Sequence, residues 1–220
     1  LDTSSGGVQF LTPYSNLEGE QFQKGTADAI RQHVGFIKRY DPEYVLILSG
    51  DHVYKMNYQV LIDQAKAHQS SLVIGAFKPG DDLSRYGIIN VEKDHLVGFE
   101  EKPENPKSDL ASMGIYVFKK DVLLDLLNEE GIDDFGANVI PLALNKGIDA
   151  CVYTFEGYFK DVGTIQALYD TNMDILDHPE KLGIYDMYEH PIYSGSENLP
   201  PHHIASADYV TNSVISDGTL

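Results

Sequence analysis

Two aspartates follow apolar segments of the sequence, at points where a ligand could bind. Asp51 comes directly after "YVLILSG" (44–50), a run typical of a buried parallel strand. Ligands of open α/β sheets bind just beyond the carboxyl ends of such strands. Asp161, in "YFKDVGT", also ends an apolar segment and precedes a predicted helix. Magnesium bound to nucleotide phosphates would use one or two such carboxylates, although either aspartate could instead simply cap a turn.

Two further short segments carry residues that suit phosphate binding. In "GFEEKP", Lys102 directly follows Glu101. It is either a solvated turn lysine or a fixed ammonium that binds a phosphate as a point charge. In "KGTADAI", Gly25 and Thr26 stand at the start of a predicted helix, where a base or phosphate can approach closely. The same pair is also a common helix cap, so this segment alone decides nothing.

The sequence contains no pattern typical of covalent catalysis. It has no Gly-x-Ser-x-Gly elbow, no His-Glu-x-x-His and no paired Cys-x-x-Cys. Its single cysteine, Cys151, lies in the apolar run "ACVYTFE", where core packing is a more ordinary role than nucleophilic attack. The carboxylates therefore remain as the groups that a magnesium enzyme would use.

The net charge excludes some classes of partner. Thirty-four acidic against sixteen basic side chains give −18 at pH 7. That field repels nucleic acid and anionic membranes, but it permits a small phosphorylated ligand that a metal or a few cations hold. No apolar run reaches the roughly 20 residues that span a bilayer, and the first ten residues lack the pattern of a signal peptide. The single cysteine leads us to expect a reducing cytoplasm.

Apolar periodicity predicts an α/β fold with a mostly parallel sheet and an inserted antiparallel part. The predicted helices span 26–40, 57–68, 121–130, 136–145 and 164–179. The predicted strands span 44–49, 71–77, 111–118 and 150–156, and a polar turn at Lys93 and Asp94 joins two antiparallel strands at 86–92 and 95–102. We expect Thr26 to cap the first helix and Pro179 to end the last.

Eight collinear motifs resemble the sugar-nucleotide pyrophosphorylases of the nucleotidyltransferase family, in particular its adenylyl branch. They are, in order, "KGTADAI", "YVLILSGDHVYKMNY", "YGIINV", "GFEEKPENP", "LASMGIYVF", "DFGANVIP", "YFKDVGT" and "NLPP". The resemblance implies a Rossmann-like (GT-A-like) nucleotidyltransferase domain over 1–185, a connector over 186–208 and the start of a left-handed β-helix over 209–220. It also implies that the family's N-terminal Gly-rich loop and most of the β-helix are missing, so we expect the chain alone to be inactive.

The implied reaction is adenylyl transfer from ATP to α-D-glucose 1-phosphate, which gives ADP-glucose and pyrophosphate for glycogen synthesis. The sugar phosphate attacks the α-phosphorus in line, so the protein need supply no nucleophile and acts by positioning and charge. The resemblance further implies Mg²⁺ as cofactor and a homo- or hetero-tetramer of the full-length protein.

The matching motifs also assign roles residue by residue. Asp51 and Lys102 match catalytic residues, and Asp51 and Asp161 match the metal ligands. Sugar-phosphate contacts are implied for Gly87, Glu101, Lys102, Ser112, Asp134 and Phe135, and nucleotide contacts for Gly25 and Thr26.

Three residues depart from the family's pattern: Gln23 replaces an aromatic residue, Ala137 a lysine and Phe159 a tryptophan. Losing a lysine near a phosphate site could remove a phosphate contact. These departures keep two alternatives open. One is a non-catalytic regulatory subunit that binds sugar phosphate or nucleotide, and the other is a transferase of the same fold that uses UTP or dTTP.

Overall fold

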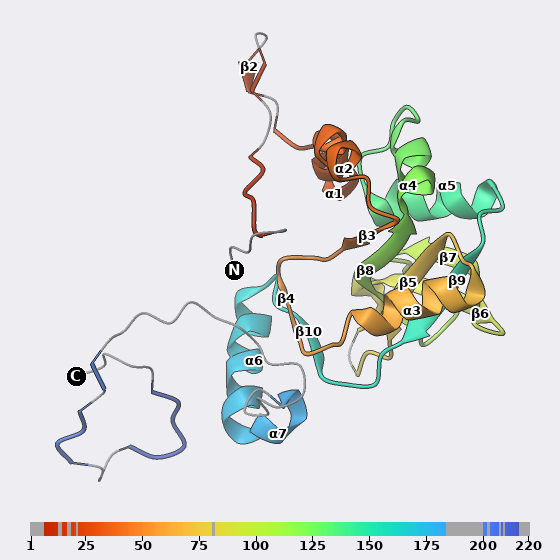
Figure 1. Cartoon of the computed structure of the whole chain (residues 1–220). Coiled ribbons are helices and arrows are strands. Elements are labelled where there is room, and N and C mark those ends of the chain that lie inside the picture. The colour runs from red at the N-terminus through yellow and green to blue at the C-terminus, as the bar shows by residue number, and fades with distance from the viewer. Residues whose placement is uncertain are drawn as a thin grey trace. The chain divides into compact units, whose positions relative to one another are not determined.

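The computed structural model of the chain divides into two compact units (Figure 1). Unit 1 comprises Leu1–Leu48 and Gln59–Phe155, and unit 2 comprises Ser49–Tyr58 and Glu156–Leu220. The residues that the structure describes are 7–12, 15–16, 19–20, 22–80, 82–183, 200–201, 203–206, 208 and 210–215.

A six-stranded sheet in the order β3-β8-β5-β9-β7-β6 forms the centre of unit 1. Its strands are β3 (Tyr44–Ile47), β5 (Leu72–Phe77), β6 (Gly87–Glu92), β7 (His95–Glu101), β8 (Ala111–Lys119) and β9 (Ala150–Thr154). Strands β3, β5, β6 and β9 run in one direction and β7 and β8 run against it. Most strands therefore share a direction, as predicted. Because β8 lies between β3 and β5, however, β5 and β9 are the sole neighbours in this sheet that pair in parallel.

The predicted antiparallel part is confirmed by the hairpin of β6 and β7. The pairing runs from Gly87 opposite Glu101 to Glu92 opposite His95. Between the strands, Lys93 and Asp94 have φ angles of 48° and 68°. Positive φ at both central residues is what a two-residue type I′ turn requires, and that turn matches the twist of the strands it joins.

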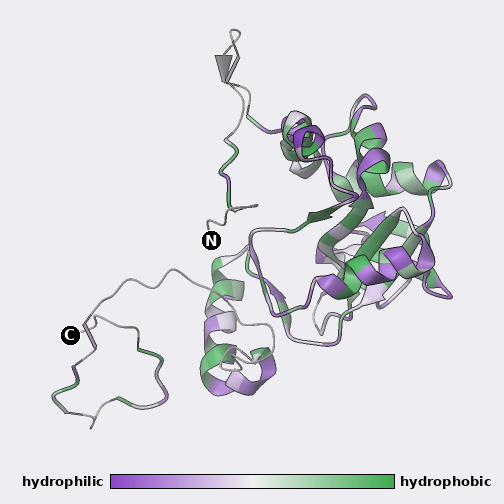
Figure 2. Cartoon of the chain, in the orientation of Figure 1, coloured by the Kyte–Doolittle hydropathy of each residue, from purple (hydrophilic) through white to green (hydrophobic). Residues whose placement is uncertain are grey.

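The core of unit 1 is built on both faces of β5, which is buried along its whole length. Leu72, Ile74 and Ala76 belong to a cluster with Leu123 and other apolar residues from the helices of one face. Those helices are α4 (Lys120–Leu127), the π-helical turn η2 (Phe135–Val139) and α5 (Ile140–Asn145). The helix α3 (Gln59–His68) contacts β5 and β9 and lies in front of them in Figure 1. Figure 2 shows the hydrophobic residues concentrated along these strands and on the inner sides of the helices.

The predicted strand 44–49 exists, but its expected burial is wrong. Strand β3 ends at Ile47 and all its residues are only partly buried, and Leu48 is 40% exposed. The reason is that β3 stands at the end of the strand order, where β8 is its sole neighbour among the described strands. An edge strand has one side without a partner, so its apolar residues are only half covered.

Three predicted helices differ in detail. The helix expected at 26–40 is divided into α1 (Thr26–Arg31) and α2 (Val34–Tyr40), because His33 leaves helical geometry with φ −113° and ψ 18°. The helix expected at 136–145 starts with η2, and Pro141 lies in the first turn of α5, where its missing N–H is tolerated. Helix α6 (Ile165–Asp177) ends before Pro179, which then begins the short helix α7 (Pro179–Leu182).

Unit 2 pairs two strands that are far apart in the sequence. They are β4 (His52–Tyr54) and β10 (Phe159–Asp161), which run antiparallel. Its helices are α6 and α7, and Lys55 donates a hydrogen bond to the Gly183 carbonyl just after α7.

Three short elements of unit 1 complete the described part: the strand pair β1 (Ser15–Asn16) and β2 (Gly19–Glu20), and the 3₁₀ turn η1 (Leu83–Arg85). Of the predicted connector, residues 186–199, 202 and 207 lie outside the described residues, as do residues 209 and 216–220 of the predicted β-helix start. Residues 210–215 carry no helix or strand. Among the described helices, none has the length and apolar character needed to cross a membrane.

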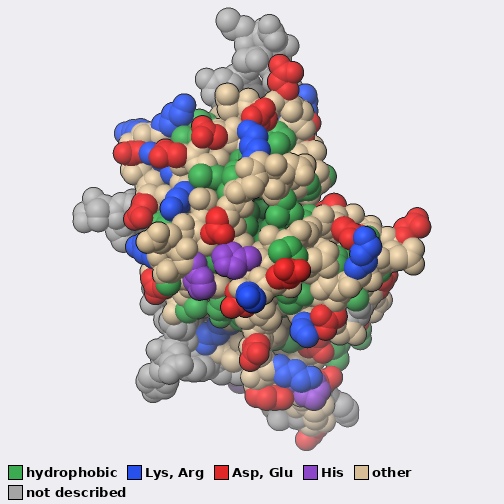
Figure 3. Space-filling model, turned by 90° about the vertical axis from the view of Figure 1, so that its right-hand side faces the viewer, with side chains coloured by type: hydrophobic (Ala, Val, Ile, Leu, Met, Phe, Trp, Pro, Cys, Tyr) green, Lys and Arg blue, Asp and Glu red, His purple; other side chains and the backbone are tan. Residues whose placement is uncertain are grey.

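The surface is rich in acidic side chains, in keeping with the net charge of −18. On the face that Figure 3 presents, Asp and Glu are spread among Lys and Arg rather than gathered into one patch. This distribution is that of a solvated acidic surface.

Candidate functional site

The structure brings the two predicted metal ligands together within unit 2. Asp161 stands opposite His52 in the antiparallel pair of β4 and β10, next to Asp51. One backbone hydrogen bond of 3.0 Å, from Val162 N–H to the Asp51 carbonyl, extends this pairing. One possible ligand atom from each of Asp51, His52 and Asp161 can be chosen so that all three lie within 4.8 Å of one another. Asp51 and Asp161 therefore lie close together, and their role as metal ligands stays a prediction.

Gly163 leaves the space around both carboxylates open. A Cβ atom at this position would lie 3.0 Å from Asp161 Oδ1 and 3.8 Å from Asp51 Oδ2. Its backbone N–H donates a 2.8 Å hydrogen bond to Asp161 Oδ1, which holds that carboxylate in place. Any larger residue at 163 would crowd the carboxylate oxygens of Asp161 and Asp51.

Sequence reasoning missed His52, which the structure places in the same group. Its Nε2 atom lies 3.5 Å from Asp51 Oδ1, and its side chain is 11% exposed against 62% for Asp51. The ring meets Phe159 edge-on, with 5.0 Å between the centroids. Its Nδ1 atom is buried with no hydrogen-bond partner among the described residues. The one signal in the sequence is its position directly after Asp51 in "SGDH".

This group of side chains fits a divalent metal ion. Carboxylate oxygens from Asp51 and Asp161 are the hard ligands that Mg²⁺ takes, usually one or two together with water and phosphate oxygens. An imidazole nitrogen from His52 is a ligand that Mn²⁺ and later transition metals accept more readily.

The predicted Glu101–Lys102 pair lies in unit 1, where two glycines make room for the glutamate. A Cβ atom on Gly136 would lie 2.2 Å from Glu101 Oε2, and one on Gly87 would lie 3.0 Å from the same oxygen. Partial burial raises the pKa of Glu101, Asp134 raises it further, and Lys102 opposes the shift. Gly87 and Asp134, both predicted sugar-phosphate contacts, thus lie beside Glu101.

Lys102 is held in an unusual backbone conformation at the end of β7. Its φ angle is +44°, a region that costs a residue with a side chain about 1–2 kcal/mol. Its N–H donates a 3.2 Å hydrogen bond to the Tyr86 carbonyl, which holds this geometry. The ammonium lies 3.7 Å from Glu101 Oε1, and the side chain is 64% exposed. The backbone conformation of Lys102 is therefore fixed, while its ammonium group stays exposed to a ligand.

Thr26 and Asp134 are joined to each other by their side chains. The Thr26 hydroxyl donates a 2.9 Å hydrogen bond to Asp134 Oδ2 and accepts one of 3.1 Å from the Phe135 N–H. The other Asp134 oxygen accepts from the Ala137 N–H and so caps η2. The expected capping role of Thr26 is wrong, because the N-cap of α1 is Gly25 and no side chain caps it.

Gly25 is required for the close approach of two backbone segments. A Cβ atom here would lie 2.4 Å from the Asp133 carbonyl oxygen. The same oxygen accepts hydrogen bonds from the N–H groups of Ala27 and Asp28. Gly25 and Thr26 therefore help to join α1 to the segment before η2. Their contact with a nucleotide stays a prediction.

Ser112 and Phe135 lie inside unit 1. The Ser112 hydroxyl accepts a 3.2 Å hydrogen bond from the Gly114 N–H and lies 3.5 Å from the Tyr116 hydroxyl. The Phe135 ring stacks on Tyr116 at 5.3 Å and is buried. Burial raises the pKa of Tyr116 to about 12, so its hydroxyl keeps its proton. The predicted sugar contacts of Ser112 and Phe135 remain predictions.

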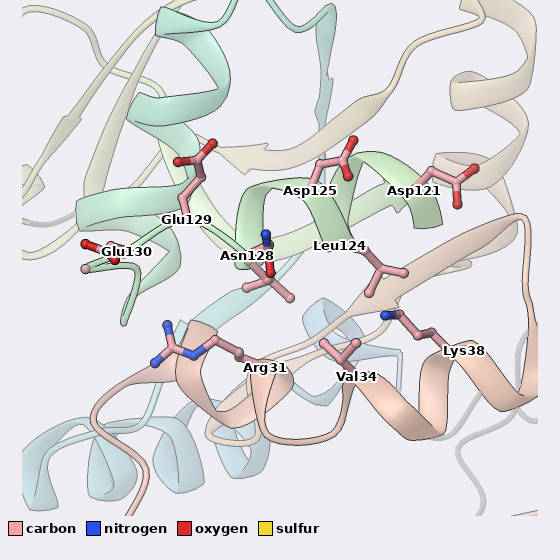
Figure 4. A pocket seen from close by; sticks show the side chains of 11 residues that line it. Arg31, Val34, Lys38, Asp121, Leu124, Asp125, Asn128, Glu129 and Glu130 are labelled. Carbon is pink, nitrogen blue, oxygen red and sulfur yellow. The ribbon is translucent and has the colours of Figure 1, made fainter.

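Two other features of unit 1 take no part in this site. A groove of about 930 Å³ lies between the helices α1 and α2 and the acidic face of α4. Figure 4 shows Arg31 and Lys38 on one side of it and Asp121 and Asp125 on the other, and no predicted site residue lines it. Cys151 is buried in β9, and burial raises the pKa of its thiol, which agrees with its predicted role in the core.

The chain is similar in sequence to known proteins. The chain is 47% identical, over its whole length, to a glucose-1-phosphate adenylyltransferase of Clostridium acetobutylicum, and covers 60% of that protein. It is 44% identical, again over its whole length, to the Bacillus cereus protein of the same name and covers 60% of it. The chain thus spans about three fifths of the length of the curated relatives it matches. The family model of the nucleotidyl transferases matches residues 6–178. The chain therefore belongs to the nucleotidyl transferase family.

Proposed function

We propose that the full-length protein transfers the adenylyl group of ATP to α-D-glucose 1-phosphate and releases pyrophosphate, with ADP-glucose as the product. The observation that carries the proposal is the meeting of Asp51 and Asp161 in the β4–β10 pair, since adenylyl transfer needs a metal beside the phosphates. The names of the similar clostridial and bacillar proteins support the choice of substrates. Such a reaction would serve glycogen synthesis in the cytoplasm.

In this proposal the chain's residues act by position and charge. Asp51 and Asp161 would hold a Mg²⁺ ion, which would supply positive charge for the phosphate oxygens. Lys102 binds the phosphate of the sugar as a point charge, and Glu101 accepts hydrogen bonds from the sugar's hydroxyl groups. The sugar phosphate oxygen then attacks the α-phosphorus in line, so no side chain forms a covalent intermediate.

Other residues would complete the two substrate sites. Gly87, Ser112, Asp134 and Phe135 would contact the sugar phosphate, and Gly25 and Thr26 would contact the nucleotide. We further propose a homo- or hetero-tetramer as the assembly of the full-length protein. The hydrogen bond between Thr26 and Asp134 supports a preformed sugar site, and so does the close fit of the Glu101 carboxylate against Gly87 and Gly136, because both hold polar groups in place before a ligand arrives.

The test is pyrophosphate release by the full-length protein with ATP, glucose 1-phosphate and Mg²⁺. We expect turnover with ATP and at least tenfold less with UTP or dTTP. A folded full-length protein with no turnover, but with measurable binding of sugar phosphate, would instead identify a regulatory subunit. Faster turnover with UTP or dTTP would overturn the choice of nucleotide and leave the reaction class intact.

A further inference from the structure

We propose that Asn138 is a positioning residue of the sugar-phosphate site, and that it controls the affinity for glucose 1-phosphate by fixing Asp134 beside Glu101. The inference rests on the proposed function, because it takes from there the sugar contacts of Asp134 and Glu101. Asn138 itself belongs to η2, a single π-helical turn, and such turns are frequent at functional sites.

The side-chain oxygen of Asn138 accepts hydrogen bonds from two successive backbone N–H groups. The nitrogen of Asp133 lies 3.1 Å from Oδ1 and the nitrogen of Asp134 lies 2.9 Å from it, which are ordinary distances for N–H···O hydrogen bonds. Only the oxygen of an amide group can accept from an N–H, so the two donors also fix which way the amide faces. The Asn138 N–H in turn donates a 3.2 Å hydrogen bond to the Asp134 carbonyl. Asn138 therefore binds Asp134 at both its backbone N–H and its backbone carbonyl.

The carboxylate of Asp134 extends from this fixed backbone, and both its oxygens accept hydrogen bonds. Oδ1 accepts one of 2.9 Å from the Ala137 N–H, and Oδ2 accepts one of 2.9 Å from the Thr26 hydroxyl. Each carboxylate oxygen has a second lone pair, so each can still accept a hydrogen bond from a sugar hydroxyl. The direction in which these lone pairs face depends on the backbone that Asn138 holds.

Electrostatic repulsion explains why Asp134 needs to be held. A Cβ atom on Gly136 would lie 2.2 Å from Glu101 Oε2 and 3.5 Å from Asp134 Oδ1, so the two carboxylates lie on the same side of this glycine. Burial raises the pKa of Glu101, and the nearby charge of Asp134 raises it further. A carboxylate that was free to turn would move away from Glu101. The hydrogen bonds of Asn138 oppose that movement and keep both carboxylates at one site.

Helix α1 is bound to the same segment by contacts that do not involve the Asn138 side chain. The Asp133 carbonyl oxygen accepts hydrogen bonds of 2.9 and 3.1 Å from the N–H groups of Ala27 and Asp28. The Asp133 carboxylate also lies 3.1 Å from the guanidinium of Arg31. These contacts hold the start of α1, where the nucleotide contacts are predicted. Loss of the Asn138 oxygen should therefore affect the sugar side more than the nucleotide side.

The test compares the KM values of the full-length protein in pyrophosphate release with ATP, glucose 1-phosphate and Mg²⁺. Asn138→Leu keeps the approximate size of the side chain and removes the acceptor. We expect its KM for glucose 1-phosphate to rise at least about tenfold, while its KM for ATP and its kcat stay within about threefold. Asn138→Asp keeps an acceptor oxygen for both N–H groups and should return the KM for glucose 1-phosphate to within about threefold of the wild type.

A double-mutant cycle determines whether Asn138 acts through Asp134. In an Asp134→Asn background, Asn138→Leu should raise the KM for glucose 1-phosphate by less than about twofold more. Leu61→Val shortens a buried side chain on α3, so it is the control for a general loss of stability and should leave both KM values unchanged. Asn138→Ala is the second variant, and it serves if the leucine variant does not fold.

Three results overturn the proposal: an unchanged KM for glucose 1-phosphate in Asn138→Leu, an equal rise of both KM values, or a fully additive cycle. Each of them leaves the proposed function standing, because the wild type still turns over. A wild type that binds glucose 1-phosphate without turnover contradicts the proposed reaction alone, and dissociation constants from titration calorimetry then test Asn138 in place of KM. A folded wild type that neither binds nor turns over glucose 1-phosphate overturns both.

Discussion

His52 and Asp161 stand opposite each other in the β4–β10 pair, and this one register brings the candidate metal ligands Asp51 and Asp161 together. The pairing extends over three residues on each strand, so the separation of the carboxylates is fixed by backbone hydrogen bonds rather than by flexible side chains. Backbone placement of this kind is what a catalytic metal site needs, because small displacements weaken charge stabilisation.

Asp51→Asn and Asp161→Asn should each reduce turnover of the full-length protein. An amide keeps the shape of the side chain but removes the charge that binds the metal, so we expect a loss of about 10²-fold or more in kcat together with weaker Mg²⁺ binding. Steady-state pyrophosphate release and calorimetric Mg²⁺ titration measure the two effects. Asp170→Asn is the control, because Asp170 is exposed on α6 in the same unit. It should keep both the turnover and the Mg²⁺ affinity of the wild type. Near-normal turnover in Asp51→Asn would remove this residue from the mechanism.

Glu101→Gln should stabilise the fold at neutral pH and weaken glucose 1-phosphate binding. The folded pKa of Glu101 is raised, mainly by partial burial, so its favourable contribution is present below its unfolded pKa and is lost as the pH rises through the folded pKa. The free energy of unfolding of Glu101→Gln should therefore exceed that of the wild type by more at pH 7 than at pH 4. Denaturant unfolding at the two pH values measures the difference. A difference that shrinks from pH 4 to pH 7 would contradict the raised pKa.

Lys102→Ala and Lys102→Gly separate the charge of Lys102 from its backbone conformation. Both remove the ammonium, so both should raise the KM for glucose 1-phosphate while the KM for ATP changes little. Only glycine accepts φ of +44° without strain. The free energy of unfolding of Lys102→Gly should therefore exceed that of Lys102→Ala by about 1 kcal/mol. Lys107→Ala removes an exposed ammonium nearby in sequence and serves as the charge control. An unchanged KM for the sugar phosphate with a raised KM for ATP would reverse the assignment of Lys102.

Thr26→Ala should destabilise unit 1, because it removes a hydroxyl that bonds both Asp134 and the Phe135 N–H. We expect a loss of about 0.5–1.5 kcal/mol for each lost hydrogen bond. Thr26→Ser keeps the hydroxyl and should retain most of the stability. Thermal or denaturant unfolding compares the two variants. If alanine and serine behave alike, the hydroxyl does not join α1 to η2 in solution.

Gly136→Ala should destabilise the protein through a clash with the carboxylate of Glu101. A Cβ atom would lie 2.2 Å from Glu101 Oε2, and such overpacking typically costs about 1–3 kcal/mol. Because the obstacle is one side chain, the same change should be milder in a Glu101→Ala background, which a double-mutant cycle of unfolding free energies measures.

Gly35→Ala is the control for the glycine prediction. Gly35 lies inside α2 with open space around its Cβ position, so alanine there should stabilise the helix by about 0.5–1 kcal/mol. A purely additive cycle between positions 136 and 101 would show that the clash does not occur.

The sequence was sufficient for those elements whose signal is local. The turn at Lys93 and Asp94 predicts the hairpin β6–β7, because two polar residues between alternating strands favour a tight turn. The continuous apolar run of β5 predicts burial on both faces, and the structure confirms it. The family resemblance implied that Asp51 and Asp161 share a metal ion, and the structure places the two side chains close together.

Features that depend on distant contacts were missed. Helices α1 and α2 are separated at Gln32 and His33, and neither residue is a glycine or proline that would predict the break. The half-burial of β3 depends on its place in the strand order, which no local pattern records. His52 was missed because its importance comes from the residue opposite it, Asp161, far away in the sequence. The ties of Thr26 to Asp134 are hidden for the same reason.

Unit 2 is built from two separate segments of the chain, and this affects the order in which the protein folds during synthesis. Its first piece, Ser49–Tyr58, leaves the ribosome well before its second piece, which begins at Glu156. Strand β4 therefore emerges before its partner β10, and most of unit 1 is synthesised between the two strands. Domains can begin to fold as they emerge, so the sheet of unit 1 has time to form first. The metal site would then be among the last parts of this protein to assemble, and binding of a divalent ion would report the completion of folding.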